Sequence, residues 1–455
     1  MANDPQAPVT SFLGSYIAET LKRDLPDEVT EKAKHHILDT LAAILKGARL
    51  GPGKLAQSYV ASRGGVEEAT IAGSGHMTTT ELAAMANAAC AHADESDDSH
   101  EPSRTHPGCS IVPAALAVAE SRDLGGAEFL KAVNVGYDVC CSLNRSLWEP
   151  GDVLRAAIES THMTGGLFGS TAAASALTGF DEYRARQAFS YAAQHASGLT
   201  TWMRDTEHVE KAFDFGGIPA RNAVASVEMV AFGLTGVTDV LDGSPSLYDA
   251  VGAEGDPQRL FDELGSVHQV MQANIKLFSV GSPIQAPAQA LTELLAEHDI
   301  AADDVDQVIC NIPARYAMIV DNRSMPDICL QYVLAVGLID QAVTFENTHD
   351  EERLHQPDVA ALMSRVDLVH DVEMEVTRQA NVALVLKDGR RLERHVFPVR
   401  GTKDNPMERS EVEAKARDLL TGVMSPGQAD ELIQSVWSLE DVVSMREFRP
   451  LLRLS

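Results

Sequence analysis

The segment Glu81–Glu120, ELAAMANAACAHADESDDSHEPSRTHPGCSIVPAALAVAE, tells more about this chain than any other. Both of its ends are alanine-rich and apolar, which is typical of buried helices. Its middle, residues 92–108, is rich in acids and histidines and has no large apolar side chain. Because such a stretch cannot pack as hydrophobic core, it must be solvated or line a polar pocket. Histidines that titrate near neutrality beside carboxylates favour the pocket.

The helical pattern extends on both sides of this segment. Pro26 and Asp27 begin a helix in which apolar residues recur at helical spacing until Gly47. The stretch TGGLFGSTAAASALTG, residues 164–179, is dense in small residues, which permits close helix packing. Further helices are expected over 80–93, 111–120, 128–147, 188–199 and 220–233.

The pattern changes near residue 270. Strands are expected over 305–313, 372–376 and 381–399, the last with a hairpin turn at Lys387–Arg390. Helices are expected between them, over 328–343 and 358–365, and again after Ser410. The sequence therefore predicts a mainly α protein. A large all-helical domain, residues 1–270 plus 402–455, contains an inserted smaller α+β domain, residues 271–401.

Composition excludes several classes of protein. The net charge of −29 over 455 residues argues against a nucleic-acid partner, since phosphate contacts need clustered cations. No apolar run approaches the ~18 residues of a membrane span, and MANDPQAPVTSF has no signal-peptide pattern, so a cytoplasmic location is expected. The six cysteines lack zinc or iron–sulfur spacing, and no glycine-rich nucleotide-binding loop is present.

Five residues of the polar tract are candidates for chemistry: Glu95, Asp97, Asp98, His100 and His106. They suit general acid and base catalysis, and they also suit coordination of a divalent metal. A solvated loop is the third interpretation, because runs of charge usually face water. No fixed-spacing ligand pair such as HExxH is present. The residues alone leave all three interpretations open.

Four isolated residues are further candidates. His162 precedes the small-residue helix, where a ligand carboxylate would meet free backbone N–H groups; the alternative is a capping or core-edge histidine. Lys211, Lys276 and Arg323 each stand alone among apolar or small neighbours. They could bind an anion, but lone cations are ordinarily surface charges.

Taken together, these segments resemble the MmgE/PrpD family, which includes 2-methylcitrate dehydratases, cis-aconitate decarboxylases and iminodisuccinate epimerases. The family pattern H-x-x-[DE]-x-D-D-[ST] corresponds to His92–Ser99, and the H-P-G that follows corresponds to His106–Gly108. Further matches are the H-x-T-G-x-x-F-G segment at His162, the segments at Lys211 and Lys276, and N-R-x-M-P at 322–326.

The resemblance implies a large helical domain with a smaller α+β lid, usually in a homodimer, and no need for an organic cofactor or a metal. It implies active-site roles for six residues: Glu95, Ser99, His106, His162, Lys211 and Lys276. The expected substrate is a small anionic polycarboxylate. Gln285 stands about where other members carry a histidine, and Glu95-Ser96 replaces Asp-Phe. These departures favour a smaller or less charged acid.

The family's reactions form a carbanion or enolate next to a carboxylate. We expect Lys211 and Lys276 to stabilise that charge, His162 to help hold the carboxylate, and His106 to transfer the proton. Glu95 or Asp98 would orient His106 or relay its proton, and Ser99 would bind the substrate oxygen. Asp97, His100 and Arg323 are expected to contribute to substrate binding.

The leading hypothesis is a dehydratase of a hydroxylated di- or tricarboxylate. The alternatives are an epimerase or racemase of a substituted dicarboxylate and then a decarboxylase of the cis-aconitate type. Outside the family, a metal-dependent hydrolase remains an alternative.

Overall fold

The computed structural model describes residues 8–148, 159–251 and 255–454. These residues are mainly helical with small sheets. The chain divides into two compact units: the first contains Met1–Ala93, Asp97–Asn274 and Val412–Ser455, and the second contains Asp94–Ser96 and Ile275–Glu411. Within the described ranges, no helix is long and apolar enough to cross a bilayer. Residues 1–7, which begin the segment considered above for a signal peptide, lie outside these ranges.

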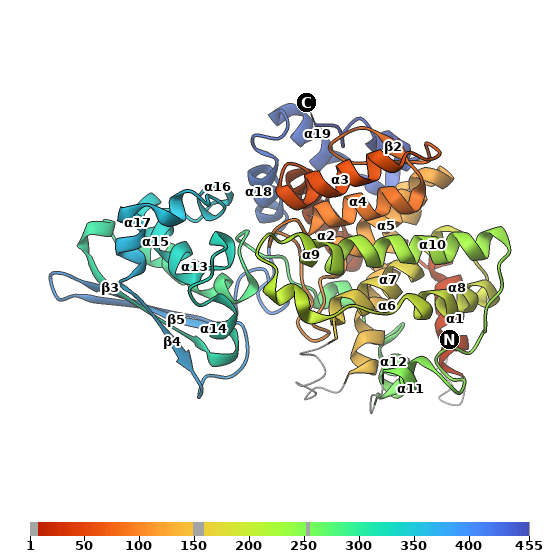
Figure 1. The fold of residues 1–455 in the computed structure, drawn as a ribbon, viewed down its shortest axis with the longest axis horizontal. Helices are drawn as coiled ribbons and strands as arrows, with labels where there is room; N and C mark the ends of the chain where they lie inside the picture. Colours follow the sequence, from red (N-terminus) through yellow and green to blue (C-terminus); the bar gives the residue numbers. More distant parts are fainter. Residues whose placement is uncertain (1–7, 149–158, 252–254, 455) are drawn as a thin grey trace. The chain divides into compact units, whose positions relative to one another are not determined.

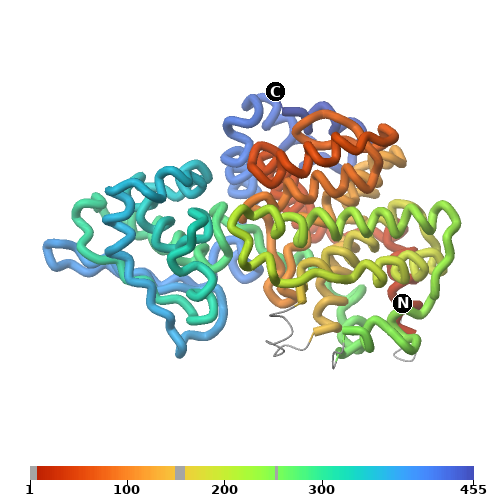
Figure 2. The backbone as a smooth tube through the Cα atoms, in the orientation of Figure 1, coloured from red at the N-terminus to blue at the C-terminus, as the bar shows by residue number. Residues whose placement is uncertain are grey.

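The first unit is built from helices that lie side by side (Figures 1 and 2). Their bounds are α1 Val9–Ala18, α2 Asp27–Gly47, α3 Gly51–Arg63, α4 Thr80–Ala91, α5 Pro107–Arg122, α6 Gly126–Leu147, α7 Thr161–Leu177, α8 Glu182–His195, α9 Val209–Ala212, α10 Ile218–Phe232, α11 Leu247–Ala250, α12 Pro257–Glu263 and α19 Pro426–Trp437, with α18 spanning Arg409–Leu420. A short antiparallel ribbon, β1 Ala69–Thr70 and β2 Met77–Thr78, also belongs to this unit. The sequence predicted an all-helical domain, so the prediction is wrong at this ribbon.

Small residues bring the central helices close together, as the sequence predicted. A Cβ atom added at Gly169 of α7 would lie 2.6 Å from the Cβ atom of Cys140 in α6. At Gly136 of α6, an added Cβ atom would lie 2.4 Å from the side chain of Ile111 in α5. These contacts leave no room for larger side chains, so α5, α6 and α7 form a tightly packed group behind the polar tract.

Two predicted helices differ from the observed ones. The helix predicted over 111–120 extends over Pro107–Arg122, because Pro107 suits the first helical position and His106 takes the N-cap. The helix predicted over 188–199 lies instead at Glu182–His195. Its true start is marked by Asp181, whose carboxylate accepts a hydrogen bond from the backbone N of Arg184 at 2.9 Å.

The second unit contains a mixed four-stranded sheet with the order β4-β3-β5-β6. Strands β3 and β4 are parallel, and the other two pairs are antiparallel. The strands are β3 Val305–Pro313, β4 Val366–Asp371, β5 Ala380–Leu386 and β6 Arg391–Val396, and the helices are α13 Gln285–Glu297, α14 Ala314–Val320, α15 Leu330–Asp340, α16 Phe345–Thr348 and α17 Pro357–Met363. Helices α13 and α15 pack against this sheet (Figure 1).

The sequence predicted β3 and the β5–β6 hairpin correctly, but the predicted strand over 372–376 is wrong. The strand that pairs with β3 is β4, whose Cys310↔Leu368 register places apolar residues opposite one another. Val372 and Val376 are 80% and 50% exposed, so the alternation that suggested a strand there reflects an exposed segment.

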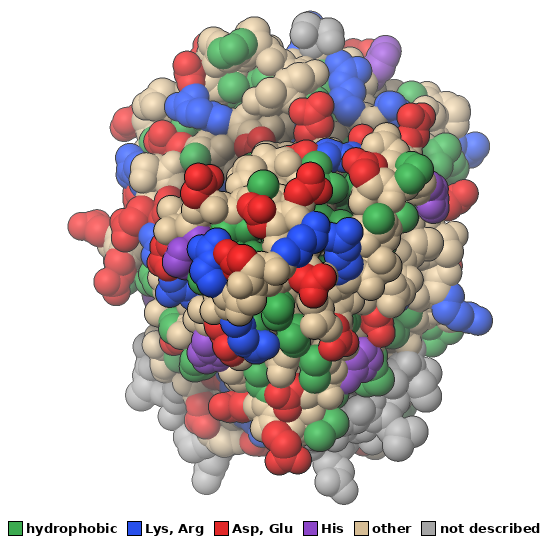
Figure 3. Space-filling view, turned by 90° about the vertical axis from the view of Figure 1, so that its left-hand side faces the viewer, with side chains coloured by type: hydrophobic (Ala, Val, Ile, Leu, Met, Phe, Trp, Pro, Cys, Tyr) green, Lys and Arg blue, Asp and Glu red, His purple; other side chains and the backbone are tan. Residues whose placement is uncertain are grey.

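On the face shown in Figure 3, acidic and basic side chains are interspersed.

Candidate active site

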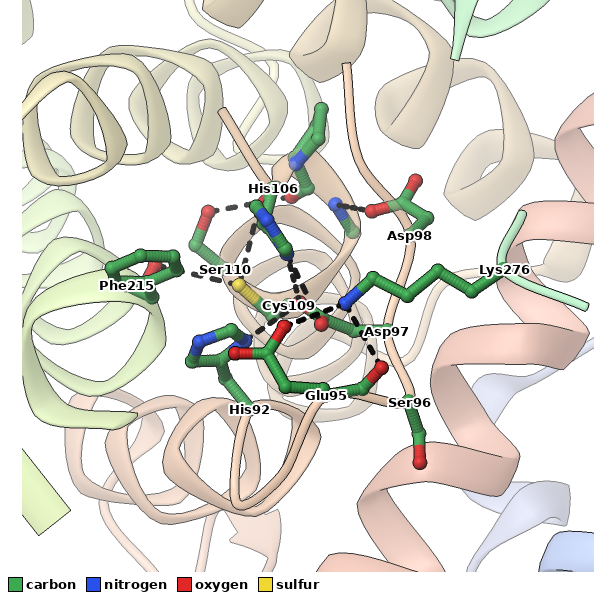
Figure 4. Close-up of polar contacts among 12 residues, drawn as sticks. His92, Glu95, Ser96, Asp97, Asp98, His106, Cys109, Ser110, Phe215 and Lys276 are labelled. Carbon is green, nitrogen blue, oxygen red and sulfur yellow. Dashed lines mark hydrogen bonds and ion pairs between the residues drawn. The ribbon is translucent and has the colours of Figure 1, made fainter. Parts of the chain in front are cut away.

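The buried carboxylate of Asp97 lies at the centre of the candidate site in the first unit (Figure 4). The Nδ1 atom of His92 lies 2.9 Å from Asp97 Oδ2. The Nδ1 atom of His106 lies 3.1 Å from both carboxylate oxygens. Because an ionised carboxylate only accepts hydrogen bonds, each Nδ1 donates, and the lone pair of each neutral ring is then on Nε2. Asp97 therefore sets the tautomer of two imidazoles at once.

The ring of Phe215 lies between two histidines. It stacks on His162 with 3.6 Å between ring centroids and on His92 with 4.2 Å. His106 meets the same ring edge-on at 5.2 Å. Lys211 places its amine 5.2 Å from the Phe215 centroid. The structure therefore brings His106, His162 and Lys211 together within the first unit, as the sequence analysis expected.

His162 occupies the first turn of α7, whose N-cap is Ser160. Burial, together with the nearby His106, His92 and Lys211, lowers the pKa of His162 well below its ordinary value. Its Nδ1 atom is buried and has no hydrogen-bond partner among the residues that the structure describes. These surroundings therefore favour the neutral form of the His162 imidazole, which can donate or accept a hydrogen bond without carrying charge.

Asp98 has a different environment from its neighbour Asp97. Its carboxylate accepts hydrogen bonds from His36 Nδ1 at 2.7 Å, from the Tyr137 hydroxyl at 2.6 Å and from the backbone N of Gly108 at 2.9 Å. Burial alone would raise the pKa of Asp98, but the hydrogen bonds from His36 and Tyr137 hold it below its ordinary value. These contacts join α2, α6 and the first turn of α5. They favour a positioning role for Asp98 over the acid–base role suggested above.

Ser99 and His100 are buried in the same tract. Ser99 pairs through its backbone with Asn274, at 3.0 and 2.7 Å, and its hydroxyl has no hydrogen-bond partner within the described residues. His100 places Nδ1 2.7 Å from the hydroxyl of Ser103, and its backbone pairs with Thr105. The contacts of His100 therefore shape the turn between Asp98 and His106, whereas the hydroxyl of Ser99 remains available to a substrate.

Two buried ion pairs belong to the second unit. The Lys276 amine lies 2.9 Å from both the side-chain Oε2 and the backbone oxygen of Glu95 (Figure 4). His349 places Nε2 3.1 Å from Asp94 and 4.0 Å from Asp327. Burial alone lowers the pKa of His349, but these carboxylates outweigh it and raise the pKa above its ordinary value. Residues 94–96 are thus held by charge within the second unit.

Arg323 and Gln285 also belong to the second unit and have structural contacts. Arg323 donates to the backbone oxygen of Ile319 at 3.3 Å, near the end of α14. The side-chain amide of Gln285 donates to the backbone oxygens of Phe278 and Val280 at 2.8 and 2.9 Å. It therefore fixes the loop after Lys276. The role of Arg323 in substrate binding stays a prediction.

The sequence analysis missed three residues of these clusters. Phe215 lies in the segment FDFGG and has the sequence signature of an ordinary core aromatic. Trp202, whose ring lies 5.5 Å from the Lys211 amine, is a single aromatic in a polar stretch. His349 is an isolated histidine with no motif around it. In each case the neighbours that give the residue its role are distant in sequence, so spacing carried no signal.

The sequence of this chain matches a known enzyme family over most of its length. The MmgE/PrpD N-terminal domain matches residues 12–260, and the MmgE/PrpD C-terminal domain matches residues 278–441. This chain belongs to the MmgE/PrpD family.

Several curated relatives are similar over nearly the whole chain. The cis-aconitate decarboxylase of Homo sapiens is 25% identical over 92% of this chain and 89% of its own length. The cis-aconitate decarboxylase of Aspergillus terreus (strain NIH 2624 / FGSC A1156) is 23% identical over 98% of this chain and 95% of its own length. A cis-aconitate decarboxylase-like protein of Aspergillus oryzae is also 23% identical, over 98% of both chains.

Proposed function

We propose that this protein is a cofactor-independent lyase that breaks a bond next to a carboxylate of a small polycarboxylic acid. The observation that carries the proposal is the shared carboxylate of Asp97, which orients both His92 and His106 through Nδ1. Two imidazoles in a defined tautomer can remove and return a proton at carbon. Membership of the MmgE/PrpD family supports this class of chemistry.

In the proposed mechanism, His106 transfers the proton, because an imidazole suits proton transfer near neutral pH and the His106 side chain is 11% exposed to solvent. Lys211 supplies positive charge to the developing carbanion or enediolate from a position beside two aromatic rings. Fixed charge in a site that excludes water stabilises a transition state more than the same charge in water. Neutral His162 donates a hydrogen bond to the substrate carboxylate.

The leaving group is the finer part of the proposal. The sequence analysis favoured loss of water from a hydroxy acid, and two oriented imidazoles support dehydration, in which one proton is removed and another is given to the departing hydroxide. The relatives named as cis-aconitate decarboxylases instead support loss of carbon dioxide. A decarboxylation needs only one proton donor, since carbon dioxide leaves without a proton. We therefore propose a hydro-lyase or carboxy-lyase and distinguish the two by assay.

One experiment tests the class and the leaving group together. The protein is incubated in deuterated water with hydroxylated tricarboxylates, unsaturated tricarboxylates and substituted dicarboxylates. For a dehydratase we expect an absorbing alkene, with deuterium next to a carboxylate of the recovered substrate when the proton transfer reverses. For a decarboxylase we expect released carbon dioxide, with deuterium on the carbon that lost it. Deuterium incorporation without either product would identify the epimerase. If no acid gives deuterium, alkene or carbon dioxide, the proposal is wrong.

A metal-dependent hydrolase is the second candidate, because one observation favours it. His92, Asp97 and His106 each offer a ligand atom, and these atoms lie within 4.8 Å of one another. Two imidazoles and a carboxylate suit divalent transition metals such as zinc or iron. The sequence analysis had considered His100 and Asp98 as ligands, but their contacts are made to Ser103 and to His36, Tyr137 and Gly108.

Exhaustive chelation separates the two candidates. We expect the lyase to keep its full turnover after dialysis against a strong chelator, since every proposed role belongs to a side chain. The measurement is the initial rate before and after dialysis, with the residual metal content of the protein determined in parallel. A loss of activity that returns on adding one equivalent of a divalent metal would favour the hydrolase.

A further inference from the structure

One aromatic ring organises the three histidines of the first unit. Phe215 stacks almost parallel to both flanking imidazoles, with interplanar angles of 14° to His162 and 13° to His92. His106 lies edge-on to both of these histidines, at 5.3 Å from His162 and 5.1 Å from His92. The site is thus a three-layer stack of imidazole, phenyl and imidazole, with the proposed proton-transferring histidine along its edge.

The backbone around Phe215 is shaped to hold the ring there. Residues 213–217 form a single π-helical turn between α9 and α10, a conformation that is rare and often found at functional sites. At Gly216 the turn lies directly against α4, since an added Cβ atom would be 2.3 Å from the backbone oxygen of Ala88. Only glycine permits this approach. Contact with α4 therefore fixes the position of the turn that carries the Phe215 ring.

Two side-chain contacts tie the same turn to the helices that carry the histidines. The carboxyl group of Asp214 accepts a hydrogen bond from Ser160, the N-cap of the helix on which His162 lies. Cys109 Sγ, in the first turn after His106, lies 3.4 Å from the backbone oxygen of Phe215. The turn therefore contacts the starts of both α5 and α7, and any shift of the turn is transmitted to His106 and His162.

We propose that Phe215 is a positioning residue, whose ring sets the spacing and orientation of His92, His106 and His162 and excludes water from the faces of two of them. This inference rests on the proposed function, since it concerns the same proton transfer. Phe215 is not proposed to react, because a phenyl ring has no proton to exchange. Its effect is on the imidazoles, which must lie within a fraction of an ångström of their working positions for efficient transfer.

Removing the ring should change the spacing of the imidazoles. Without the flat face of Phe215, His162 and His92 lose the surface on which their rings stack at 3.6 and 4.2 Å from its centroid. His106 lies edge-on to both of these rings, so its orientation should change with theirs. Because proton transfer depends on that orientation, kcat should fall while KM changes less.

The test compares Phe215→Leu with Phe168→Leu in the full chain. Phe168 is a matched control, since it is a fully buried phenylalanine of α7 that stacks on Phe189 at 5.6 Å. The first measurement follows, by NMR at one fixed pH, the NOEs between the ring protons of isotope-labelled His106 and His162, with His162 assigned by its loss in His162→Gln. The second is the rate of turnover, with kcat and KM resolved.

For Phe215→Leu we expect the NOEs between His106 and His162 to weaken and kcat to fall by about 10²-fold, with a smaller change in KM. Phe168→Leu should leave these NOEs in place. Phe215→Met, which keeps the apolar volume without the flat face, should reproduce the weakened NOEs and covers the case in which the leucine variant does not fold.

Unchanged NOEs in both Phe215 variants, or an equal loss in Phe168→Leu, would overturn the inference. The NMR measurement needs no substrate, so it decides the role of Phe215 even if no acid is turned over and the proposed function fails.

Discussion

Replacing His106 with asparagine should lower turnover by about 10²–10⁴-fold while leaving the fold intact. The asparagine amide can still donate to Asp97, as Nδ1 of His106 does at 3.1 Å, so the buried carboxylate keeps a partner on that side. What is lost is the Nε2 atom, the position through which the ring would exchange a proton with the substrate. The loss should therefore fall mainly on kcat.

The measurement is the rate of deuterium incorporation and of product formation under saturating substrate, with circular dichroism as a check on the fold. His395→Asn is the matched control, because His395 is an exposed histidine of β6 whose ring lies 3.3 Å from Gln379. It should keep the wild-type rate. Wild-type exchange in the His106 variant would remove His106 from the mechanism and leave His92, on the same carboxylate, as the candidate base.

Replacing Lys276 with methionine should cause the largest loss of stability, about 3–5 kcal/mol. The side chain of Lys276 is fully buried and its amine lies 2.9 Å from Glu95 Oε2, whose side chain is only 5% exposed. Removing the amine takes away the cation that lies beside the buried Glu95 carboxylate. The penalty is that of a buried charge that has lost its ion partner, and it exceeds the attraction that the intact pair contributes.

A double replacement identifies the cause. Adding Glu95→Gln to Lys276→Met should recover more than half of the lost stability, because the buried charge is then gone. The measurement is urea unfolding of the full chain, followed by a probe in the second unit. As a control, Lys22→Met removes an exposed lysine that lies 2.8 Å from Glu19 and should leave the unfolding curve almost unchanged. An equally small effect at Lys276 would show that the pair contributes nothing to folding.

Local patterns predicted most of the secondary structure because the forces that shape it are local. The helix from Asp27 to Gly47 and the β5–β6 hairpin depend on apolar periodicity and on turn residues, which a sequence displays directly. The wrong strand at 372–376 has a tertiary cause. Apolar and polar residues alternate as regularly over 372–376 as they do in β4, but only β4 pairs with β3. Which of two segments pairs with a distant strand cannot be predicted from the sequence of either segment alone.

The candidate site was predictable in part. His106, His162 and Lys211 were identified from residue type and family resemblance, and they lie around Phe215 in the first unit. The sequence could not show that neighbouring carboxylates have different hydrogen-bond partners and therefore different roles. Asp97 and Asp98 are adjacent, yet one binds His92 and His106 and the other joins three helices. That difference arises from burial and partner geometry, which depend on the whole fold.

The single carboxylate shared by His92 and His106 couples the two rings. Both Nδ1 atoms lie within 3.1 Å of Asp97, and the rings meet edge-on with 5.1 Å between their centroids. A change in the position of one ring should therefore reach the other through the carboxylate. Substitutions at the two histidines are then expected to be non-additive, so the effect of a double replacement cannot be obtained by summing the single ones.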